Sequence, residues 1–440
     1  MKNKKWMAIL LGGIMAASLA APCSVSAAEK TTLTFWHAMG GTNGEVLQQI
    51  VDDFNASQDE IEVKAEYQGT YDDTITKLKA AMQSDSGLPD VCQMYDVGTK
   101  FMYDSGAVIP VEDKFESTGY DKSSVMEVIS SYYTVDGKQY AMPFNVSTPM
   151  LYYNKDVFEA AGLDPETPPT TYDEVLEDAK KIVESGAAPV GYSQAIYGWF
   201  FEQQLAGLGV TYGNNDNGRT EAVTAVDFDS NGGGLKVFDM WKKLYDSGYF
   251  EDYGTTTADT QTAFFSGQVG MIIESTAILK NAVDSSPFEV GTGYLPRIEQ
   301  NDEGGVIIGG GSLWLTDTGN EANEDAAWKF IEYITTPDVQ AKWSMGTGYF
   351  AINEKAYETD DMKAYLKENP NFETAINQLK DSPVNCNTAG VLSGVQTEAR
   401  LTFNEIMPQV YDGKLTTQDA VDQLAASVNK AIENYNESIK

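Results

Sequence analysis

The sequence contains few residues of the kinds that carry enzyme chemistry. It has one histidine, His37, among 440 residues, so only one imidazole is present to act as a general base. It has no G-x-x-x-x-G-K-[ST] phosphate loop and no G-x-S-x-G nucleophile elbow. We therefore interpret His37 as structural. Carboxylates are abundant, so a pair of acids of the glycosidase type stays open, although abundance makes any chosen pair uninformative.

Cysteine is also scarce, with three residues in the chain. Cys92 and Cys386 are distant in sequence and too few for a disulfide scaffold; their pairing stays open, and free thiols are favoured. A possible calcium loop at residues 214–218 fails, because setting Gly218 at the sixth position puts Gly213 at the first, where an Asp is needed. We interpret this segment as a polar turn and predict no metal and no cofactor.

Positive charge is in short supply. The chain has 30 basic and 65 acidic residues, a formal net charge of −35, and its only arginines are Arg219, Arg297 and Arg400. Such acidity argues against nucleic-acid binding, which needs a basic surface. It also repels anions at long range, so an anionic ligand would need a locally positive pocket.

The first 27 residues have the parts of a secretory signal peptide: a basic start, an apolar stretch over residues 7–21, and a small-residue cleavage site ending at Ala27. Cys23 raises the alternative of a lipid anchor, but Pro22 stands where a lipobox has a small residue. No later segment has about 20 uninterrupted apolar residues. We expect export across the cytoplasmic membrane to the periplasm or cell surface, with cleavage after Ala27 and lipidation of Cys23 as the alternative.

Strand and helix patterns alternate over the first part of the exported chain. Apolar residues alternate with polar ones at 33–35 and 61–65, and 91–95 is a short apolar run. Between them, residues 46–54 and 75–82 place apolar side chains at helical spacing. This order predicts a parallel sheet with right-handed crossover helices.

A second βα unit follows at residues 147–186. Residues 150–153 form an apolar run with β-forming side chains, and Asn154 is well placed to cap a short helix over 155–161. Thr171 and Glu174 have the spacing of a capping box, so a longer helix should begin there.

The phrase YYNKD.F..AGLDP..PPTTYDE in this unit resembles the signature of the extracellular solute-binding proteins of ABC importers, in the branch that binds sugars and glycerol 3-phosphate. Further family phrases recur at residues 262–271, 307–314, 327–343 and 347–352. The resemblance spans essentially the whole chain after the signal peptide. It implies an α/β, two-lobed periplasmic-binding-protein fold of type II, each lobe a mostly parallel sheet flanked by helices, with a hinge between the lobes.

The resemblance also implies where the chain crosses between lobes. After the signal peptide at 1–27, the first lobe should comprise residues 28–143 plus about 276–325. The second lobe should comprise residues 144–275 plus about 326–440. Such proteins close about a hinge around a ligand that binds in the cleft.

Within the family, the chain is most similar to members that bind glycerol 3-phosphate. The motif Q.Y.VGT at residues 93–99 implies that Asp96 accepts hydrogen bonds from glycerol hydroxyls, and Tyr71 matches a ligand-contacting tyrosine. Trp36 and Trp199 are candidate aromatic walls. On the phosphate side, matching implies Ser147, Ser275, Gly310, Tyr349 and Arg400. Hydroxyls and a Gly amide can donate to oxyanions, and an Arg fork pairs with phosphate.

Two differences from the members that bind glycerol 3-phosphate bear on which ligand is expected. Those members have a second Trp where this chain has Ile196, and a Glu where this chain has Gly in the segment 39–41. Both changes alter the cleft, so a larger phosphodiester or a sugar comes into consideration.

The resemblance implies a binding subunit rather than an enzyme, acting as a monomer with the membrane permease of an ABC importer and with no nucleic acid. Its expected ligand is glycerol 3-phosphate or a glycerophosphodiester. An oligosaccharide binder on the same fold is the nearer alternative, and there Arg400 would be dispensable. A secreted glycosidase is the more distant one.

Overall fold

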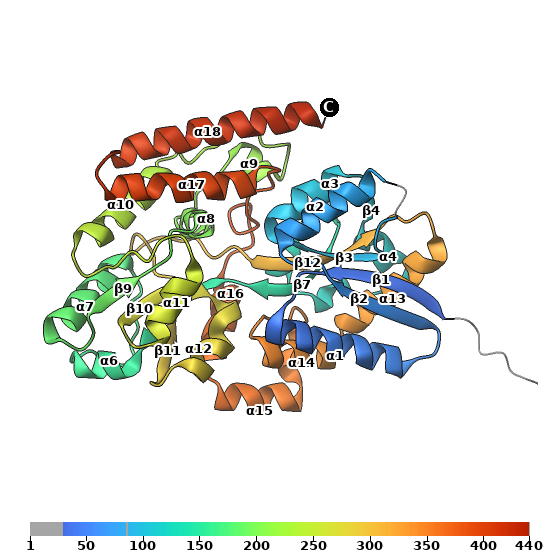
Figure 1. Ribbon diagram of the computed structural model, residues 1–440, viewed down its shortest axis with the longest axis horizontal. Helices are drawn as coiled ribbons and strands as arrows, with labels where there is room; N and C mark the ends of the chain where they lie inside the picture. The colour runs from blue at the N-terminus through green and yellow to red at the C-terminus, as the bar shows by residue number, and fades with distance from the viewer. Residues whose placement is uncertain (1–29, 85–86, 440) are drawn as a thin grey trace, which may run out of the picture.

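The computed structural model describes residues 30–84 and 87–439. The predicted signal peptide and Cys23 lie outside the described residues. In the part of the chain that is described, no helix is both long and apolar enough to cross a membrane. Figure 1 shows two α/β lobes side by side, with the C-terminal helices lying along one of them.

The first lobe is built on a six-stranded sheet in the order β2-β1-β3-β12-β4, with β7 also paired to β12. As the alternating pattern predicts, β1 is parallel to both β2 and β3. However, β12 is antiparallel to β3, β4 and β7, so the sheet is mixed rather than mostly parallel. The strands are β1 (Thr31–His37), β2 (Ile61–Tyr67), β3 (Val91–Tyr95), β4 (Val108–Ile109), β7 (Met142–Ser147) and β12 (Gly309–Thr316).

The second lobe is built on a four-stranded mixed sheet in the order β11-β8-β10-β9. β8 is antiparallel to β10 and β11, whereas β10 and β9 are parallel. Because β11 still belongs to this sheet, the chain returns to the first sheet at β12, later than the expected position near residue 276. The strands are β8 (Pro149–Asn154), β9 (Val190–Ser193), β10 (Val269–Ser275) and β11 (Val290–Gly293); a separate hairpin joins β5 (Thr134–Val135) and β6 (Lys138–Gln139).

Helices cover the first sheet from segments far apart in sequence. α13 packs against β1, and α14 packs against α1, so residues 326–347 lie on the first lobe and not on the second as the resemblance implied. The helices of this lobe are α1 (Gly41–Ser57), α2 (Tyr71–Met82), α3 (Thr99–Asp104), α4 (Val111–Thr118), α5 (Glu127–Ser130), α13 (Glu321–Ile334) and α14 (Pro337–Thr347).

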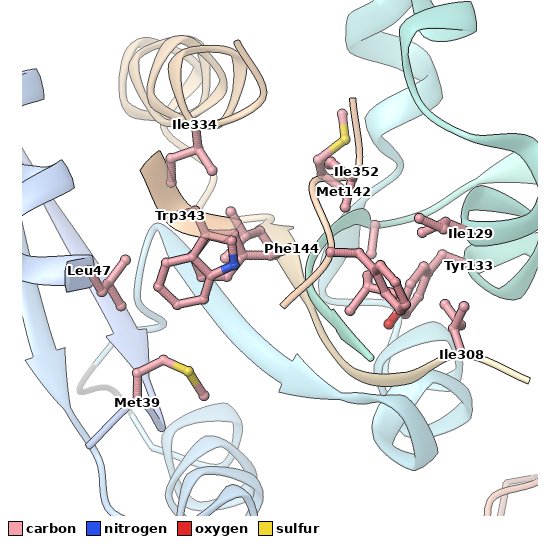
Figure 2. Packing of buried hydrophobic residues seen from close by; sticks show 14 of the residues in the cluster. Met39, Leu47, Ile129, Tyr133, Met142, Phe144, Ile308, Ile334, Trp343 and Ile352 are labelled. Atoms are coloured by element: carbon pink, nitrogen blue, oxygen red, sulfur yellow. The ribbon is translucent and has the colours of Figure 1, made fainter. Parts of the chain in front are cut away.

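Apolar burial explains this placement. The indole of Trp343 on α14 stacks on Phe144 of β7, with ring centroids 4.5 Å apart. Figure 2 shows Trp343 among Leu47, Phe144 and Ile334, which come from α1, β7 and α13. All four side chains are fully buried. Removing this large apolar surface from water stabilises the packing of α13 and α14 on the first lobe.

The second lobe collects the remaining helices. α17 packs against α8 and α18, and α18 packs against α10, so the last helices lie on this lobe (Figure 1). Its helices are α6 (Lys155–Ala160), α7 (Tyr172–Ser185), α8 (Gly198–Gly207), α9 (Asn214–Gly218), α10 (Gly233–Asp246), α11 (Thr257–Phe265), α12 (Leu279–Ser285), α16 (Asn371–Asp381), α17 (Gln396–Tyr411) and α18 (Thr417–Ser438), with α15 (Asp360–Glu368) between α14 and α16.

The local signals of the second βα unit are confirmed. The Asn154 side chain accepts a hydrogen bond from the Val157 N–H at 3.1 Å and caps α6. Thr171 and Glu174 form a reciprocal capping box at the start of α7. The cap and the capping box satisfy N–H groups that a helix start otherwise leaves without partners.

Several residues singled out from the sequence have structural roles. His37 is buried, and its Nδ1 accepts a hydrogen bond from the Met39 N–H at 3.3 Å. Burial lowers its pKa to about 4, so the ring is neutral at neutral pH. Cys92 and Cys386 are both free thiols. The polar turn at 214–218 is a tight left-handed turn, with positive φ at three consecutive non-glycine residues.

Candidate functional site

A cavity of about 560 Å³ lies between the lobes. Its walls come from β7, β12 and the start of a 3₁₀ turn (η1, Asp96–Gly98) in the first lobe, and from α8, α11, β10 and α17 in the second. Its volume is in the range that encloses small organic ligands. Six of the nine predicted ligand residues line it: Asp96, Ser147, Trp199, Ser275, Gly310 and Arg400.

Strand ends bring these residues together. Asp96 directly follows β3, Ser147 ends β7, and Ser275 ends β10. Ser147 pairs with Gly309 in the first sheet, which places it beside Gly310. Gly310 has φ +93°, and a Cβ there would lie 1.8 Å from the Asn145 carbonyl oxygen, so only glycine fits.

Arg400 crosses the cleft and is held by two carboxylates. Its Nε and Nη2 donate to the two oxygens of Glu202 at 2.7 Å each, a bidentate pair within the second lobe. Its Nη2 also donates to Asp96 of the first lobe at 2.8 Å. All three side chains are more than nine-tenths buried. Arg400 is therefore part of a buried charge cluster rather than of a surface ion pair.

The charges in this cluster shift one another's pKa values. Burial raises the pKa of the Glu202 carboxyl, and the charge and hydrogen bonds of Arg400 oppose that shift. Burial alone would lower the pKa of Arg400, but Asp96 and Glu202 outweigh it and hold the pKa above its usual range. The guanidinium is therefore charged, and it is flanked by one carboxylate from each lobe.

The cluster leaves donors available to a ligand. Arg400 Nη1 carries two N–H groups and has no hydrogen-bond acceptor among the described residues. Ser147 Oγ likewise has no hydrogen-bond partner within residues 30–84 and 87–439. Ser275 Oγ accepts from the Ala277 N–H at 3.2 Å, which leaves its own O–H to donate. Arg400, Ser147 and Ser275 thus bring three donor groups to one cavity.

An aromatic pair forms another part of the wall. Tyr197 and Trp199 lie at the start of α8 with ring centroids 6.1 Å apart and planes tilted by 49°. Trp199 is 5 % exposed, and its Nε1 is buried without a partner in the described part of the chain. Trp199 packs closely over Gly309, where a Cβ would lie 2.8 Å from the indole.

The other three predicted residues lie outside the cavity lining. Tyr71 accepts a hydrogen bond from Asn145 Nδ2 at 2.8 Å and stacks on Tyr95. Tyr349 stacks on Trp343 in the first lobe. Trp36 donates from Nε1 to Glu66 on β2 at 3.1 Å. Ligand contacts for Tyr71, Tyr349 and Trp36 stay predictions.

Sequence reasoning missed several residues of the site, and two of them had a detectable signal: Glu274, which lines the cavity, and Glu202, which holds Arg400 from behind. Glu202 and Glu274 are single acids within apolar elements, the helix GWFFEQQLAG and the strand VGMIIES. A charged side chain is rarely buried unless it is paired or functional, so its place in an apolar run was informative. The other missed lining residues are Tyr197, Thr255, Thr256, Thr257, Gln261, Ile278 and Gly309.

A larger cavity of about 770 Å³ lies elsewhere, between α5, the β5–β6 hairpin and the segment 384–389. It contains none of the predicted ligand residues. The guanidinium at its wall, Arg219, has all its donors turned to backbone carbonyls. We therefore place the functional site in the smaller cavity, where unpaired donors and buried charges converge.

Two α/β lobes with a polar, ligand-sized cleft between them define a solute-binding protein of the periplasmic type. The chain belongs to the bacterial extracellular solute-binding protein family, whose model matches residues 49–374. It is 30% identical over 417 residues to the sn-glycerol-3-phosphate-binding periplasmic protein UgpB of Escherichia coli (strain K12), covering 93% of this chain and 94% of that protein.

Solved structures agree on the fold. The cyclic alpha-maltosyl-1,6-maltose binding protein from Arthrobacter globiformis has a TM-score of 0.76 at 26% identity, covering 92% of this chain and 100% of that one. UgpB from Mycobacterium tuberculosis, in complex with glycerophosphocholine, has a TM-score of 0.78 at 20% identity, covering 93% and 100%. The protein is thus the extracellular solute-binding subunit of an ABC importer.

Proposed function

We propose that this subunit captures glycerol 3-phosphate or a glycerophosphodiester in the interlobe cleft and releases it, chemically unchanged, to its membrane permease. The observation that carries the proposal is the free edge of Arg400. Nη1 offers two donors to the cavity, while Glu202 fixes the rest of the guanidinium in place. A guanidinium that is fixed in place on one side and has unpaired N–H groups on the other can donate to a phosphate oxygen.

The neighbouring groups suit the rest of such a ligand. The hydroxyls of Ser147 and Ser275 can donate to further phosphate oxygens, and both line the cavity with Arg400. Asp96 can accept from glycerol hydroxyls, because a carboxylate has more acceptor sites than Arg400 uses. The relative with 30% identity is a glycerol-3-phosphate-binding protein, which supports the same ligand class.

Hinge closure gives the binding its mechanism. Arg400 already joins Asp96 of the first lobe to Glu202 of the second. Ser147 of the first lobe lines the same cavity, so a ligand held by Arg400 and Ser147 contacts both lobes at once. A ligand that binds the closed arrangement more tightly shifts the population toward closure. The permease then receives a closed, loaded subunit.

The test is a calorimetric titration of the purified protein with glycerol 3-phosphate, glycerophosphocholine, glycerol, maltose and lactose. We expect micromolar binding, about −8 kcal/mol, for at least one phosphate ligand and none for glycerol. Arg400→Lys keeps the charge but loses the fork, so it should weaken the phosphate ligand by about tenfold or more. Binding of neutral sugars only, or unchanged phosphate binding by Arg400→Lys, would overturn the proposal.

A second candidate is an oligosaccharide binder. The specific observation in its favour is the Tyr197–Trp199 pair beside the carboxylates of Asp96 and Glu274, since sugar faces stack on aromatic rings and their hydroxyls donate to carboxylates. The Arthrobacter globiformis relative binds a cyclic maltosyl-maltose. In that case maltose or a longer glucan binds in the same titration, and Arg400→Lys leaves its affinity within about threefold.

A further inference from the structure

Glu274 is a buried carboxylate that faces the cleft without a cationic partner. Its side chain lines the cavity, and the residue is 4 % exposed. Gln261 Nε2 donates to one oxygen at 2.9 Å, and the Ser275 N–H donates to the other at 2.7 Å. No Lys or Arg of the described residues forms an ion pair with it. Burial without a countercharge disfavours the ionised form of this carboxyl, and a cationic ligand group would stabilise that form.

The aromatic pair provides the second observation. Burial raises the pKa of the Tyr197 phenol; Arg400 opposes this, and Asp96, Glu202 and Glu274 add to it. Tyr197 and Glu274 line the same cavity. Its hydroxyl has no hydrogen-bond partner in the described chain, and the buried Trp199 Nε1 beside it has none either. An electron-rich ring face beside a carboxylate is the arrangement that receives ammonium groups.

The balance of charges in the cavity also favours a ligand with an ammonium group. The cavity and the carboxylate behind Arg400 together hold one cation and three carboxylates: Arg400, with Asp96, Glu202 and Glu274. A phosphate monoester would add about −1.5 to −2 further charge at pH 7. A phosphodiester adds only one negative charge, and an ammonium group on the same molecule cancels it.

Resting on the proposed function, we infer that Glu274 and Tyr197 form a subsite for a cationic head group, so that the cleft selects zwitterionic glycerophosphodiesters. The phosphate lies at Arg400, Ser147 and Ser275, and the ammonium group lies at Glu274 against the Tyr197 ring. An acidic cleft then accepts a phosphate ligand because the ligand brings its own cation.

The experiment compares three phosphate ligands by calorimetry: glycerophosphocholine, which carries a quaternary ammonium, and glycerophosphoinositol and glycerol 3-phosphate, which do not. We expect the unchanged protein to bind glycerophosphocholine at least tenfold more tightly than glycerophosphoinositol. In Glu274→Gln, which keeps the shape and one acceptor, glycerophosphocholine should weaken by about tenfold. Glycerophosphoinositol should be unchanged or tighter, so the preference disappears.

A matched control removes one carboxylate elsewhere on the same lobe. Glu159→Gln changes an exposed residue of α6 and should retain the full preference for glycerophosphocholine. Tyr197→Leu removes the ring and should lose most of the preference, whereas Tyr197→Phe should restore it, since the ring face carries the contact.

The outcomes separate the two proposals. If no phosphate ligand binds the unchanged protein, the proposed function and this subsite both fail. If phosphate ligands bind but Glu274→Gln weakens all of them equally, or none of them, the cationic subsite is wrong and the phosphate site stands. An equal affinity of the unchanged protein for glycerophosphocholine and glycerophosphoinositol would also overturn it.

Discussion

Arg219 and Arg400 both lie on second-lobe segments, and the guanidinium group of each donates hydrogen bonds to the first lobe. Their partners differ. Arg219 donates to the carbonyls of Tyr132 and Thr134 in the first lobe and of Ala389 and Gly390 in the segment between α16 and α17. Arg400 donates to the carboxylates of Asp96 and Glu202.

The two arginines differ in the charge of their partners and in the number of N–H groups that stay unpaired. Arg219 has hydrogen bonds from all three nitrogens to neutral carbonyls, with no carboxylate partner among the described residues, and burial lowers its pKa to about 10. Arg400 is overcompensated by two carboxylates and still keeps Nη1 free. A saturated arginine joins backbone segments, whereas a clamped arginine with open donors can bind a ligand.

The largest expected effect is that of Arg400→Ala. It leaves Asp96 and Glu202 buried without their cation, which should cost about 3–5 kcal/mol of unfolding free energy. It should also abolish the calorimetric signal of the phosphate ligand. Urea denaturation with and without ligand measures both effects. Adding Glu202→Gln should recover part of the stability and none of the binding; recovered binding would refute a direct role for Arg400.

Arg219→Ala tests the structural side of the comparison. It removes the guanidinium that donates to four backbone carbonyls. We expect the free energy of unfolding, measured in urea, to fall by about 3 kcal/mol. Ligand affinity measured by calorimetry should stay within about fivefold, since Arg219 is absent from the cleft lining. Arg297→Ala provides the matched control, because Arg297 is exposed and should change stability by about 0.5 kcal/mol or less. Equal losses for both variants would contradict the assigned role.

Glu202→Gln changes how far the charge of Arg400 is compensated. We expect a loss of about 1–2 kcal/mol of stability, because the bidentate ion pair is replaced by a neutral contact. At the same time the cluster becomes less negative, so glycerol 3-phosphate should bind about fivefold more tightly. Calorimetry checks the affinity, and weaker binding would mean that Glu202 mainly orients the guanidinium.

The smallest effect is expected for Glu274→Gln in the absence of ligand. Burial raises the pKa of the Glu274 carboxyl, with Gln261 and the Ser275 N–H opposing, so the ionised form is disfavoured in the fold. Replacing it by a neutral amide should raise stability by about 0.5–1 kcal/mol. The gain should be absent at a pH low enough to protonate the carboxyl. A clear loss of stability at neutral pH would show that Glu274 holds the cleft together.

Local sequence signals predicted the elements of the fold well where short-range chemistry decides them. Asn154, Thr171 and Glu174 cap helices as expected, because a cap involves residues two or three positions apart. The predicted strands of the first sheet also form. The placement of α13 and α14 was wrong because it depends on Trp343 finding Phe144 about 200 residues earlier in the chain, a contact that no local pattern encodes.

The candidate site divides in the same way. Family phrases brought Asp96, Ser147, Ser275, Gly310 and Arg400 into consideration, and these residues line one cavity. The sequence did not pair Arg400 with Glu202, because the two lie on α17 and α8, far apart along the chain. Composition alone does not separate Arg219 from Arg400, since both are rare cations in an acidic chain; only the family match assigned Arg400 to the site.

The sequence by itself determined the class of protein: the periodicity and caps encode the βα units, and the family phrases identify an extracellular solute-binding subunit. Only the tertiary structure decided the electrostatics of the cleft. Charge interactions depend on distance and burial, and folding alone places two carboxylates on Arg400 and leaves Glu274 in the cleft lining without a cation among the described residues.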